Sequence, residues 1–258
     1  MEQLIHFNNN FGEKLAGTLH MPIRPSGHAV IFGHCFTCTR HTAIFSHICS
    51  ELTEKGFMAL RFDFSGNGQS EGNFAESTYS KQISEMQTAI NLLSEKGAFW
   101  IGLAGHSLGA VITLLTAAQQ QTVQAVCTLA GRLSGLNAMH FLSQNQRREL
   151  QNTDKVKFSS RGRALQLSND FFADAEKYNL PKVVASLQIP LLIVHGDSDE
   201  IVPVREAYQA HEMNPANTKL AVIPQADHMF SRLEHRQQIS ELVVAWFTEQ
   251  RTPLFPRT

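Results

Sequence analysis

Short apolar runs alternate with amphipathic segments along most of the chain. After two short strands expected at 4–7 and 14–21, continuous apolar runs predict buried strands at 28–33, 57–64, 99–105, 123–131, 189–196 and 219–224. Apolar residues at helical spacing predict helices at 41–56, 77–96, 107–121, 204–213 and 233–249. Because continuous apolar strands separated by helices are typical of sheets covered on both faces, we predict an α/β fold with a mostly parallel central sheet.

One stretch, from Arg132 to about Leu180, interrupts this alternation. It is richer in Arg, Gln, Asn and Ser than its surroundings, and its apolar residues are scattered. An insert of this length inside a compact domain is usually functional or disordered. Its aromatic residues favour a small cap containing some helix, although the insert would also suit a cover over one edge of the sheet. We therefore expect a single domain over residues 1–258 with a cap insertion at about 132–180.

Composition narrows the class of protein further. The chain has 258 residues, 43% of them hydrophobic, and a formal net charge of −1, which gives no electrostatic reason to expect nucleic-acid binding. No apolar run approaches the roughly 18 residues of a membrane span. Four cysteines do not suggest a secreted disulfide framework, and the N-terminus lacks the features of a signal peptide, so we expect a cytoplasmic protein. Nothing in the sequence indicates a particular oligomeric state.

The strongest chemical signal is the pentapeptide GHSLG at 105–109. It joins the expected strand at 99–105 to the expected helix at 107–121, and G-x-S-x-G in that context is a nucleophile elbow. The elbow places the serine in a strained turn at the carboxyl edge of the sheet. Glycines are needed on both sides because a Cβ atom would collide with the neighbouring strand and helix. The pattern therefore predicts Ser107 as a nucleophile.

An activated serine requires a general base and an orienting acid, which follow it in the order Ser, acid, His in this kind of fold. The loop GDSDEIVP follows the strand at 189–196 and offers Asp197, Asp199 and Glu200. The loop QADHMF follows the strand at 219–224 and offers His228. Because Asp197 and Asp199 are two residues apart, spacing lets only one of them face His228, and the other would act in the turn.

These motifs together resemble the α/β-hydrolase superfamily. The segments GHSLG, HGDSDEIVP and ADHMF are closest to small serine esterases of the cinnamoyl/feruloyl-esterase and serine-aminopeptidase-like group. HCFTC, LRFDFSGNGQSEG and GRALQLSNDFF resemble the hydrolase domain of bacterial proteins that fuse it to an osmotically inducible peroxidase-type domain. The resemblance implies the α/β-hydrolase fold and assigns the acid to Asp199. It also implies an oxyanion hole formed by the backbone N–H groups of Phe36 and Leu108.

The segment GHCFTCTRH at 33–41 departs from the usual pattern. Cys35 stands where most relatives have glycine, and Cys38 completes a C-x-x-C spacing flanked by His34 and His41. Read alone, this segment is compatible with a metal site, a redox pair or no cysteine chemistry. Four ligands this close together do not match the usual zinc spacing, and no thioredoxin-like unit surrounds the pair. We therefore expect Cys38 to be a small packing residue.

The GNGQSEG loop at 66–72 does not have the spacing of a dinucleotide-binding loop, and we expect Asp63 to stabilise its turn. Arg161 and Arg163, like Arg147 and Arg148, would suit either an acidic substrate or a solvated cap surface. The sequence thus predicts a serine hydrolase, foremost a carboxylesterase acting on small or aromatic acyl esters without metal or cofactor. A thioesterase, peptidase or acyltransferase would use the same residues, and a non-catalytic binding protein is the further alternative.

Two adjacent aromatic residues of the insert are candidates for substrate binding. Phe171 and Phe172 are two of the apolar residues scattered through the predicted cap. We expect one or both to line the wall that holds the acyl or aryl group of a small-molecule ester.

Overall fold

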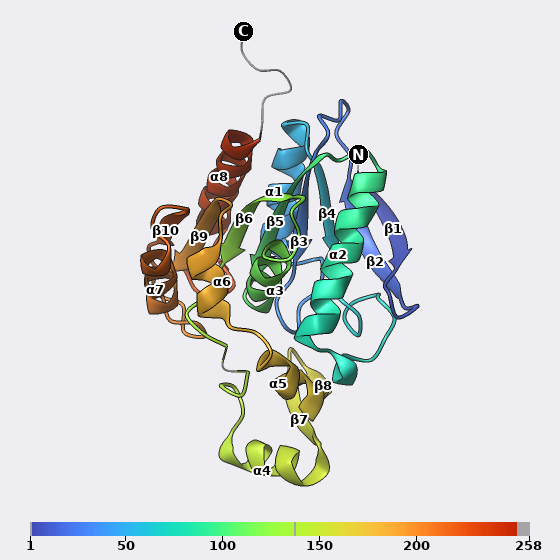
Figure 1. The fold of residues 1–258 in the computed structure, drawn as a ribbon, viewed down its shortest axis with the longest axis vertical. Helices are drawn as coiled ribbons and strands as arrows, with labels where there is room; N and C mark the ends of the chain where they lie inside the picture. Colours follow the sequence, from blue (N-terminus) through green and yellow to red (C-terminus); the bar gives the residue numbers. More distant parts are fainter. Residues whose placement is uncertain (1, 137, 252–258) are drawn as a thin grey trace.

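A central eight-stranded sheet organises the protein, and Figure 1 shows helices packed on both of its faces. The computed structural model describes residues 2–136 and 138–251. The strands are β1 (Glu2–Asn8), β2 (Lys14–His20), β3 (His28–Gly33), β4 (Met58–Phe62), β5 (Trp100–His106), β6 (Val123–Leu129), β9 (Leu191–Gly196) and β10 (Thr218–Ile223). Their order in the sheet is β1-β2-β4-β3-β5-β6-β9-β10.

All pairs from β4 to β10 are parallel, and only β1 and β2 pair antiparallel with their neighbours. The predicted mostly parallel sheet is therefore confirmed. Parallel strands all present their carboxyl ends at one edge, where loops of different origin meet. The loops that carry the candidate site follow β3, β5, β9 and β10.

The two faces of the sheet carry separate apolar cores. Helices α1 (Ala43–Glu54) and α8 (Leu233–Gln250) pack on one face. Helices α2 (Tyr79–Glu95), α3 (Leu108–Ala117), α6 (Leu180–Ser186) and α7 (Arg205–Met213) contribute to the core of the other. Because side chains alternate along a strand, Val30 and Phe32 of β3 join the first core and Ile31 joins the second. This two-sided burial explains the continuous apolar runs of the sequence.

The insert between β6 and β9 contains its own small unit at one end of the molecule (Figure 1). It consists of α4 (Gln144–Thr153), β7 (Lys155–Ser160), β8 (Arg163–Ser168) and α5 (Asn169–Ala175), and β7 and β8 pair as an antiparallel hairpin. Helix was expected here, but the hairpin was not. Its signal is visible in hindsight, because apolar residues alternate with polar ones on both strands. Arg161 and Gly162 form the turn with φ angles of 52° and 72°.

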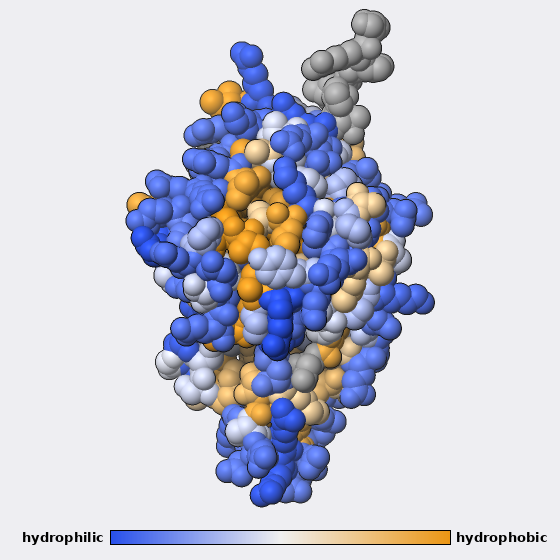
Figure 2. All heavy atoms as spheres, turned by 90° about the vertical axis from the view of Figure 1, so that its left-hand side faces the viewer, coloured by the Kyte–Doolittle hydropathy of each residue, from blue (hydrophilic) through white to orange (hydrophobic). Residues whose placement is uncertain are grey.

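The side of the molecule that carries β10, α7 and α8 shows a patch of apolar residues surrounded by polar ones (Figure 2). β10 is the last strand of the sheet, and its Leu220, Ala221 and Val222 are only half-buried. Among the described residues, no helix combines the length and hydrophobicity needed to cross a bilayer.

Candidate active site

Ser107 lies in a sharp turn between β5 and α3. Its backbone φ of 56° and ψ of −115° are rare for a non-glycine residue, and its N–H donates to the carbonyl of Leu129 at 2.9 Å. A Cβ atom on Gly105 would collide with the carbonyl of Gly109, and one on Gly109 would collide with the carbonyl of Gly33. The two glycines of the pentapeptide are thus required by backbone contacts, as the sequence pattern predicted.

His228 connects the serine to an acid. Its Nε2 lies 3.1 Å from Ser107 Oγ, and its Nδ1 lies 2.8 Å from Asp199 Oδ2. The structure therefore brings together the three side chains singled out in the sequence, from the loops after β5, β9 and β10. Asp199 and His228 are both buried, so these hydrogen bonds face little competition from solvent.

The carboxylate of Asp199 is held on both oxygens. Oδ1 accepts the N–H groups of Ile201 at 2.9 Å and Val202 at 2.7 Å. Oδ2 contacts His228 and also His195 Nε2, at 3.3 Å. Burial alone would raise the pKa of Asp199, but the hydrogen bonds from His195, His228 and Val202 outweigh it and hold the pKa well below its ordinary value. Asp199 is accordingly ionised across the physiological range.

The neighbouring aspartate has a different environment. Asp197 is exposed, and its Oδ1 accepts the N–H of Gln225 at 2.6 Å, which ties the loop after β9 to the loop after β10. Of the two aspartates, only Asp199 contacts His228. His195 was missed as a contributor. Its signal is the spacing of four residues to Asp199, which lets a histidine at the end of β9 reach back to the carboxylate.

His106, which precedes the serine, contacts the backbone of the proposed base, His228. Its Nε2 lies 2.8 Å from the backbone carbonyl of His228, so this nitrogen carries the hydrogen. Burial, with a smaller contribution from the charge of His228, lowers the pKa of His106 to about 3. A neutral imidazole therefore fixes the backbone of the base. No sequence pattern indicated this role, because the second position of the pentapeptide varies freely in the pattern.

Two residues whose backbone N–H groups are unpaired within the described chain line the same cavity as Ser107. They are Phe36, in the loop after β3, and Leu108, the first residue of α3. Among the described residues, neither N–H donates to another protein group. Free N–H groups at a helix start and an adjacent loop suit a developing negative charge on a bound substrate.

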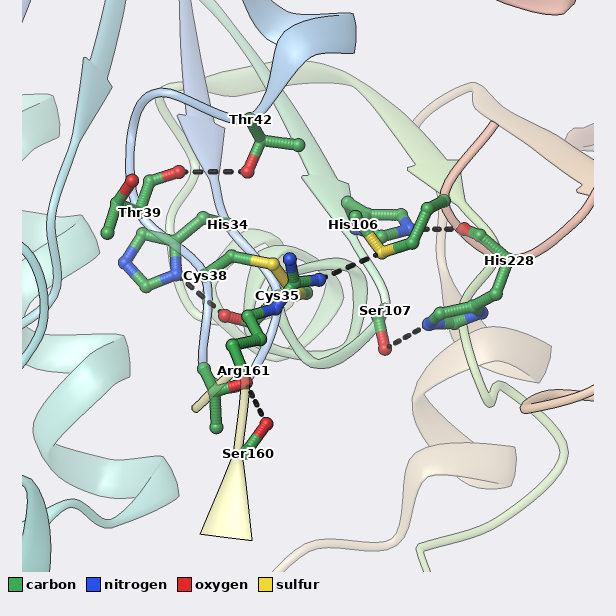
Figure 3. Close-up of a disulfide and its surroundings, with 12 residues drawn as sticks. His34, Cys35, Cys38, Thr39, Thr42, His106, Ser107, Ser160, Arg161 and His228 are labelled. Atoms are coloured by element: carbon green, nitrogen blue, oxygen red, sulfur yellow. Dashed lines mark hydrogen bonds between the residues drawn. A yellow bond between two sulfur atoms is a disulfide. The ribbon is translucent and has the colours of Figure 1, made fainter. Parts of the chain in front are cut away.

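The loop that carries Phe36 is closed by a disulfide between Cys35 and Cys38 (Figure 3). The expectation that Cys38 is only a packing residue is therefore wrong. The reason is a tight turn in which the N–H of Cys38 donates to the carbonyl of Cys35 at 3.1 Å, bringing the two side chains to the same side. The sulfur atoms and one ring nitrogen of His106 lie within 4.8 Å of one another, the only such group of potential metal ligands among the described residues.

The ends of this loop are anchored independently. His34 Nδ1 donates to the carbonyl of Cys35 at 2.7 Å, and its Nε2 accepts the N–H of Phe64 at 3.0 Å. At the other end, Asp63 accepts the N–H of Arg40 at 2.6 Å and pairs with its guanidinium, and it also accepts the N–H of Gln69. Asp63 thus stabilises the turn before the GNGQSEG loop, as predicted, and fixes the cysteine loop as well.

A cavity of about 650 Å³ opens above Ser107 and is bounded by the insert. Its wall is largely aromatic, with the rings of Phe36, Phe141, Phe158, Phe171 and Tyr79. Phe36 packs against Phe158 at a centroid distance of 5.8 Å and against Phe171 at 5.4 Å. A mostly apolar wall with a few polar groups at one end is typical of a small-molecule site.

The two candidate aromatic residues of the insert differ in position. Phe171 lines the cavity, whereas Phe172 is buried behind it and contacts Phe171 and Phe141. Consecutive helix residues point about 100° apart, which directs the two rings differently. Arg161, at the tip of the β7–β8 hairpin, also lines the cavity, and its guanidinium lies 3.2 Å from Met229 Sδ.

Residues 28–177 match the protein family described as serine aminopeptidase, S33. The mouse mitochondrial palmitoyl-protein thioesterase ABHD10 is 27% identical over 194 residues, which is 73% of this chain and 63% of that protein. A 93-residue stretch is 38% identical to the uncharacterized peptidase YuxL of Bacillus subtilis and spans 14% of its length. The chain thus covers less than two thirds of these curated relatives.

Solved structures of similar shape cover almost the whole chain. Est1E of Butyrivibrio proteoclasticus with bound ferulic acid superposes with a TM-score of 0.82 at 24% identity, over 95% of this chain and 98% of that one. The esterase domain of a Rhodothermus marinus protein gives 0.74 at 25% identity, over 96% and 98%. Mouse ABHD10 gives 0.79 at 22% identity, over 96% and 100%.

Proposed function

Because the chain belongs to the serine aminopeptidase, S33 family and has the α/β-hydrolase fold, we propose that it is a carboxylesterase that uses Ser107, His228 and Asp199. The family resemblance and the fold class predicted from the sequence are both confirmed. The single observation that carries the proposal is the continuous hydrogen-bonded series from Ser107 Oγ through His228 to Asp199. A protein that only bound ligands would have no need for this series.

In the proposed reaction, Ser107 Oγ attacks the acyl carbonyl while His228 Nε2 takes its proton. Asp199 keeps the other hydrogen of His228 on Nδ1, so that Nε2 faces the serine as an acceptor, and it stabilises the imidazolium that forms. His106 and His195 act indirectly: His106 holds the backbone of His228, and His195 holds the carboxylate of Asp199. The histidine then protonates the leaving alcohol and later activates water to release the acid.

The negative charge of the tetrahedral intermediate is assigned to the N–H groups of Phe36 and Leu108. Both are free and line the cavity at Ser107, which supports this role. Donors held in place before the reaction lower the barrier by about 3–4 kcal/mol each, because they need no reorganisation as charge develops.

The aromatic wall of the cavity supports small or aromatic acyl esters as substrates. The similar structure of Est1E holds ferulic acid, an aromatic acid, which agrees with this substrate class. Thioesters are a second candidate, favoured by the sequence similarity to palmitoyl-protein thioesterase over 73% of the chain. Both substrates would be attacked by the same serine, and they differ in the group that leaves.

A matched substrate panel tests the proposal. One acyl group, cinnamoyl, is presented as an ethyl ester, a thioester and an anilide, and hydrolysis is followed by chromatography with wild type and with Ser107→Ala. We expect the highest kcat/KM for the ester and loss of all activity in the variant. A preference for the thioester would shift the assignment to the second candidate, and activity that survives in Ser107→Ala would overturn the mechanism.

A further inference from the structure

The disulfide between Cys35 and Cys38 has little to do with global stability. It spans a sequence separation of only three residues, and a crosslink across so short a loop removes little entropy from the unfolded chain. Its effect is local, because the bridged segment contains Phe36, which lines the cavity at Ser107. The same segment contacts the insert, since Thr37 Oγ1 lies 2.8 Å from Ser160 Oγ.

His106 gives the sulfur pair an unusual neighbour. Its Nε2 is engaged with the carbonyl of His228, and its Nδ1 is fully buried without a hydrogen-bond partner among the described residues. A bridged pair of sulfur atoms has no hydrogen to offer this nitrogen. A reduced cysteine does, because its S–H is a donor. Because one ring nitrogen of His106 lies within 4.8 Å of both sulfur atoms, an S–H of the reduced pair is a nearby donor for the unpartnered Nδ1, which favours the dithiol relative to a disulfide in other surroundings.

We propose that Cys35 and Cys38 form a reversible redox site that reacts with a small dithiol entering through the substrate cavity. Both cysteines are buried, but Cys35 is among the residues that line this cavity with Ser107 and Cys38 is not. Cys35 Sγ is thus the accessible sulfur. The tight turn at 35–38 keeps the two thiols close after reduction, so that reoxidation needs no rearrangement of the fold.

The exchange balances as a two-electron reaction. A thiolate of the dithiol attacks Cys35 Sγ, the bond to Cys38 breaks, and Cys38 leaves as a thiolate that takes a proton from solvent. The second thiolate of the reagent then attacks the mixed disulfide, forms the cyclic disulfide of the reagent and releases Cys35, which is also protonated. The protein gains two electrons and two protons, and the dithiol loses them.

Reduction would alter the loop that presents the oxyanion donor. The anchors at His34 and Arg40 remain, but between them the bridge no longer restrains Phe36. This consequence rests on the proposed function, because it requires the N–H of Phe36 to contact the reacting oxygen. We expect the reduced protein to have a kcat roughly tenfold lower, a fraction of the loss on removing one oxyanion donor, with KM little changed.

The redox site is tested by thiol counting, independently of activity. Folded protein is equilibrated with mixtures of reduced and oxidised dithiothreitol, quenched with acid, unfolded, alkylated and weighed as intact mass. We expect a reversible transition between two and four alkylated cysteines, with the change mapped to Cys35 and Cys38, since Cys49 and Cys127 are free throughout. A pair that stays oxidised or stays reduced in every mixture would overturn the proposal.

Two variants examine the role of His106 and the link to catalysis. His106→Gln keeps a donor near Nε2 and removes the acceptor at Nδ1, so the equilibrium should shift toward the disulfide by on the order of fivefold. An unchanged equilibrium would refute the part assigned to His106, with Cys49→Ala as the unchanged control. Cys38→Ser cannot form the bridge, and its activity should not respond to dithiol treatment.

Kinetics are measured after the reagent has been removed by gel filtration, on the oxidised and reduced forms of the same sample. Equal kcat values in the two forms would overturn the coupling to the oxyanion loop. If neither form hydrolyses any ester, the proposed function fails, while the thiol counts still decide whether the redox site exists.

Discussion

Replacing Asp199 by asparagine should abolish most of the activity, because the hydrogen bonds of this position would force His228 into the wrong tautomer. Asp199 Oδ1 accepts two backbone N–H groups, from Ile201 and Val202. An asparagine must keep its only oxygen at that position, which turns its NH₂ group toward His228. Because two donors cannot face each other, His228 must then carry its hydrogen on Nε2. That nitrogen can no longer accept the proton of Ser107.

The expected loss follows from the wrong tautomer. A triad whose acid becomes an amide loses about 10⁴ in kcat in serine proteases, equivalent to about 5.5 kcal/mol of barrier. Rotation of the amide does not relieve this, because its NH₂ group would then face the backbone N–H donors of Ile201 and Val202. We expect kcat of Asp199→Asn to fall by about 10³–10⁴ with KM little changed.

Asp197→Asn is the matched control, because it makes the same chemical change two residues away. Its exposed carboxylate accepts one N–H from Gln225, and an asparagine oxygen can do the same. Activity should stay within about threefold of wild type. Both variants are compared with wild type by kcat and KM on a chromogenic ester, with circular dichroism to verify folding. Equal losses in the two variants, or a larger loss in Asp197→Asn, would refute the assignment of the acid.

Three further outcomes follow from packing and charge. Gly105→Ala should lower the free energy of unfolding by about 3 kcal/mol, because its Cβ collides with backbone. Gly135→Ala, with nothing within 4 Å, should leave the melting temperature unchanged, and equal melting temperatures of the two variants would contradict the collision at Gly105. Phe171→Ala and Phe172→Ala should each lower the free energy of unfolding by about 3–5 kcal/mol, because both rings are buried. Only Phe171→Ala should raise KM for cinnamoyl esters, by roughly tenfold, because only Phe171 lines the cavity. A similar rise of KM in both variants would show that the cavity wall is misassigned. The depressed pKa of Asp199 stabilises the fold at pH values above its unfolded pKa of about 3.9, and this contribution is lost as pH falls toward the folded pKa. In urea unfolding, the difference in free energy of unfolding between wild type and Asp199→Asn should therefore narrow below about pH 4. A constant difference down to about pH 3 would contradict this reasoning.

The sheet and its helices were predictable because their signals are local. Strands buried on both faces need continuous apolar runs, and β3, β5 and β9 have them. The elbow was predictable because a Cβ atom on either of its two glycines would collide with neighbouring backbone. The loop after β9 and the position of His228 followed from the rule that loops after parallel strands gather at one edge, whereas the choice of Asp199 over Asp197 came from the family resemblance.

Other features depend on contacts between distant segments and could not be derived from spacing. The role of His106 arises from a hydrogen bond to a carbonyl 122 residues away. The bridge between Cys35 and Cys38 depends on the turn geometry of their loop, and the C-x-x-C spacing alone is equally compatible with two free thiols. The hairpin of the insert was overlooked because its strands are largely exposed, so their alternation involves few strongly apolar residues.

An activated Ser107 is central to the proposed mechanism, and covalent labelling tests for it directly. Wild type and Ser107→Ala are treated with a fluorophosphonate, and adducts are located by intact mass and peptide mapping. We predict one adduct per wild-type chain, on Ser107, and none in the variant. A folded wild-type protein that forms no adduct, or one that is labelled elsewhere, would contradict the proposed mechanism.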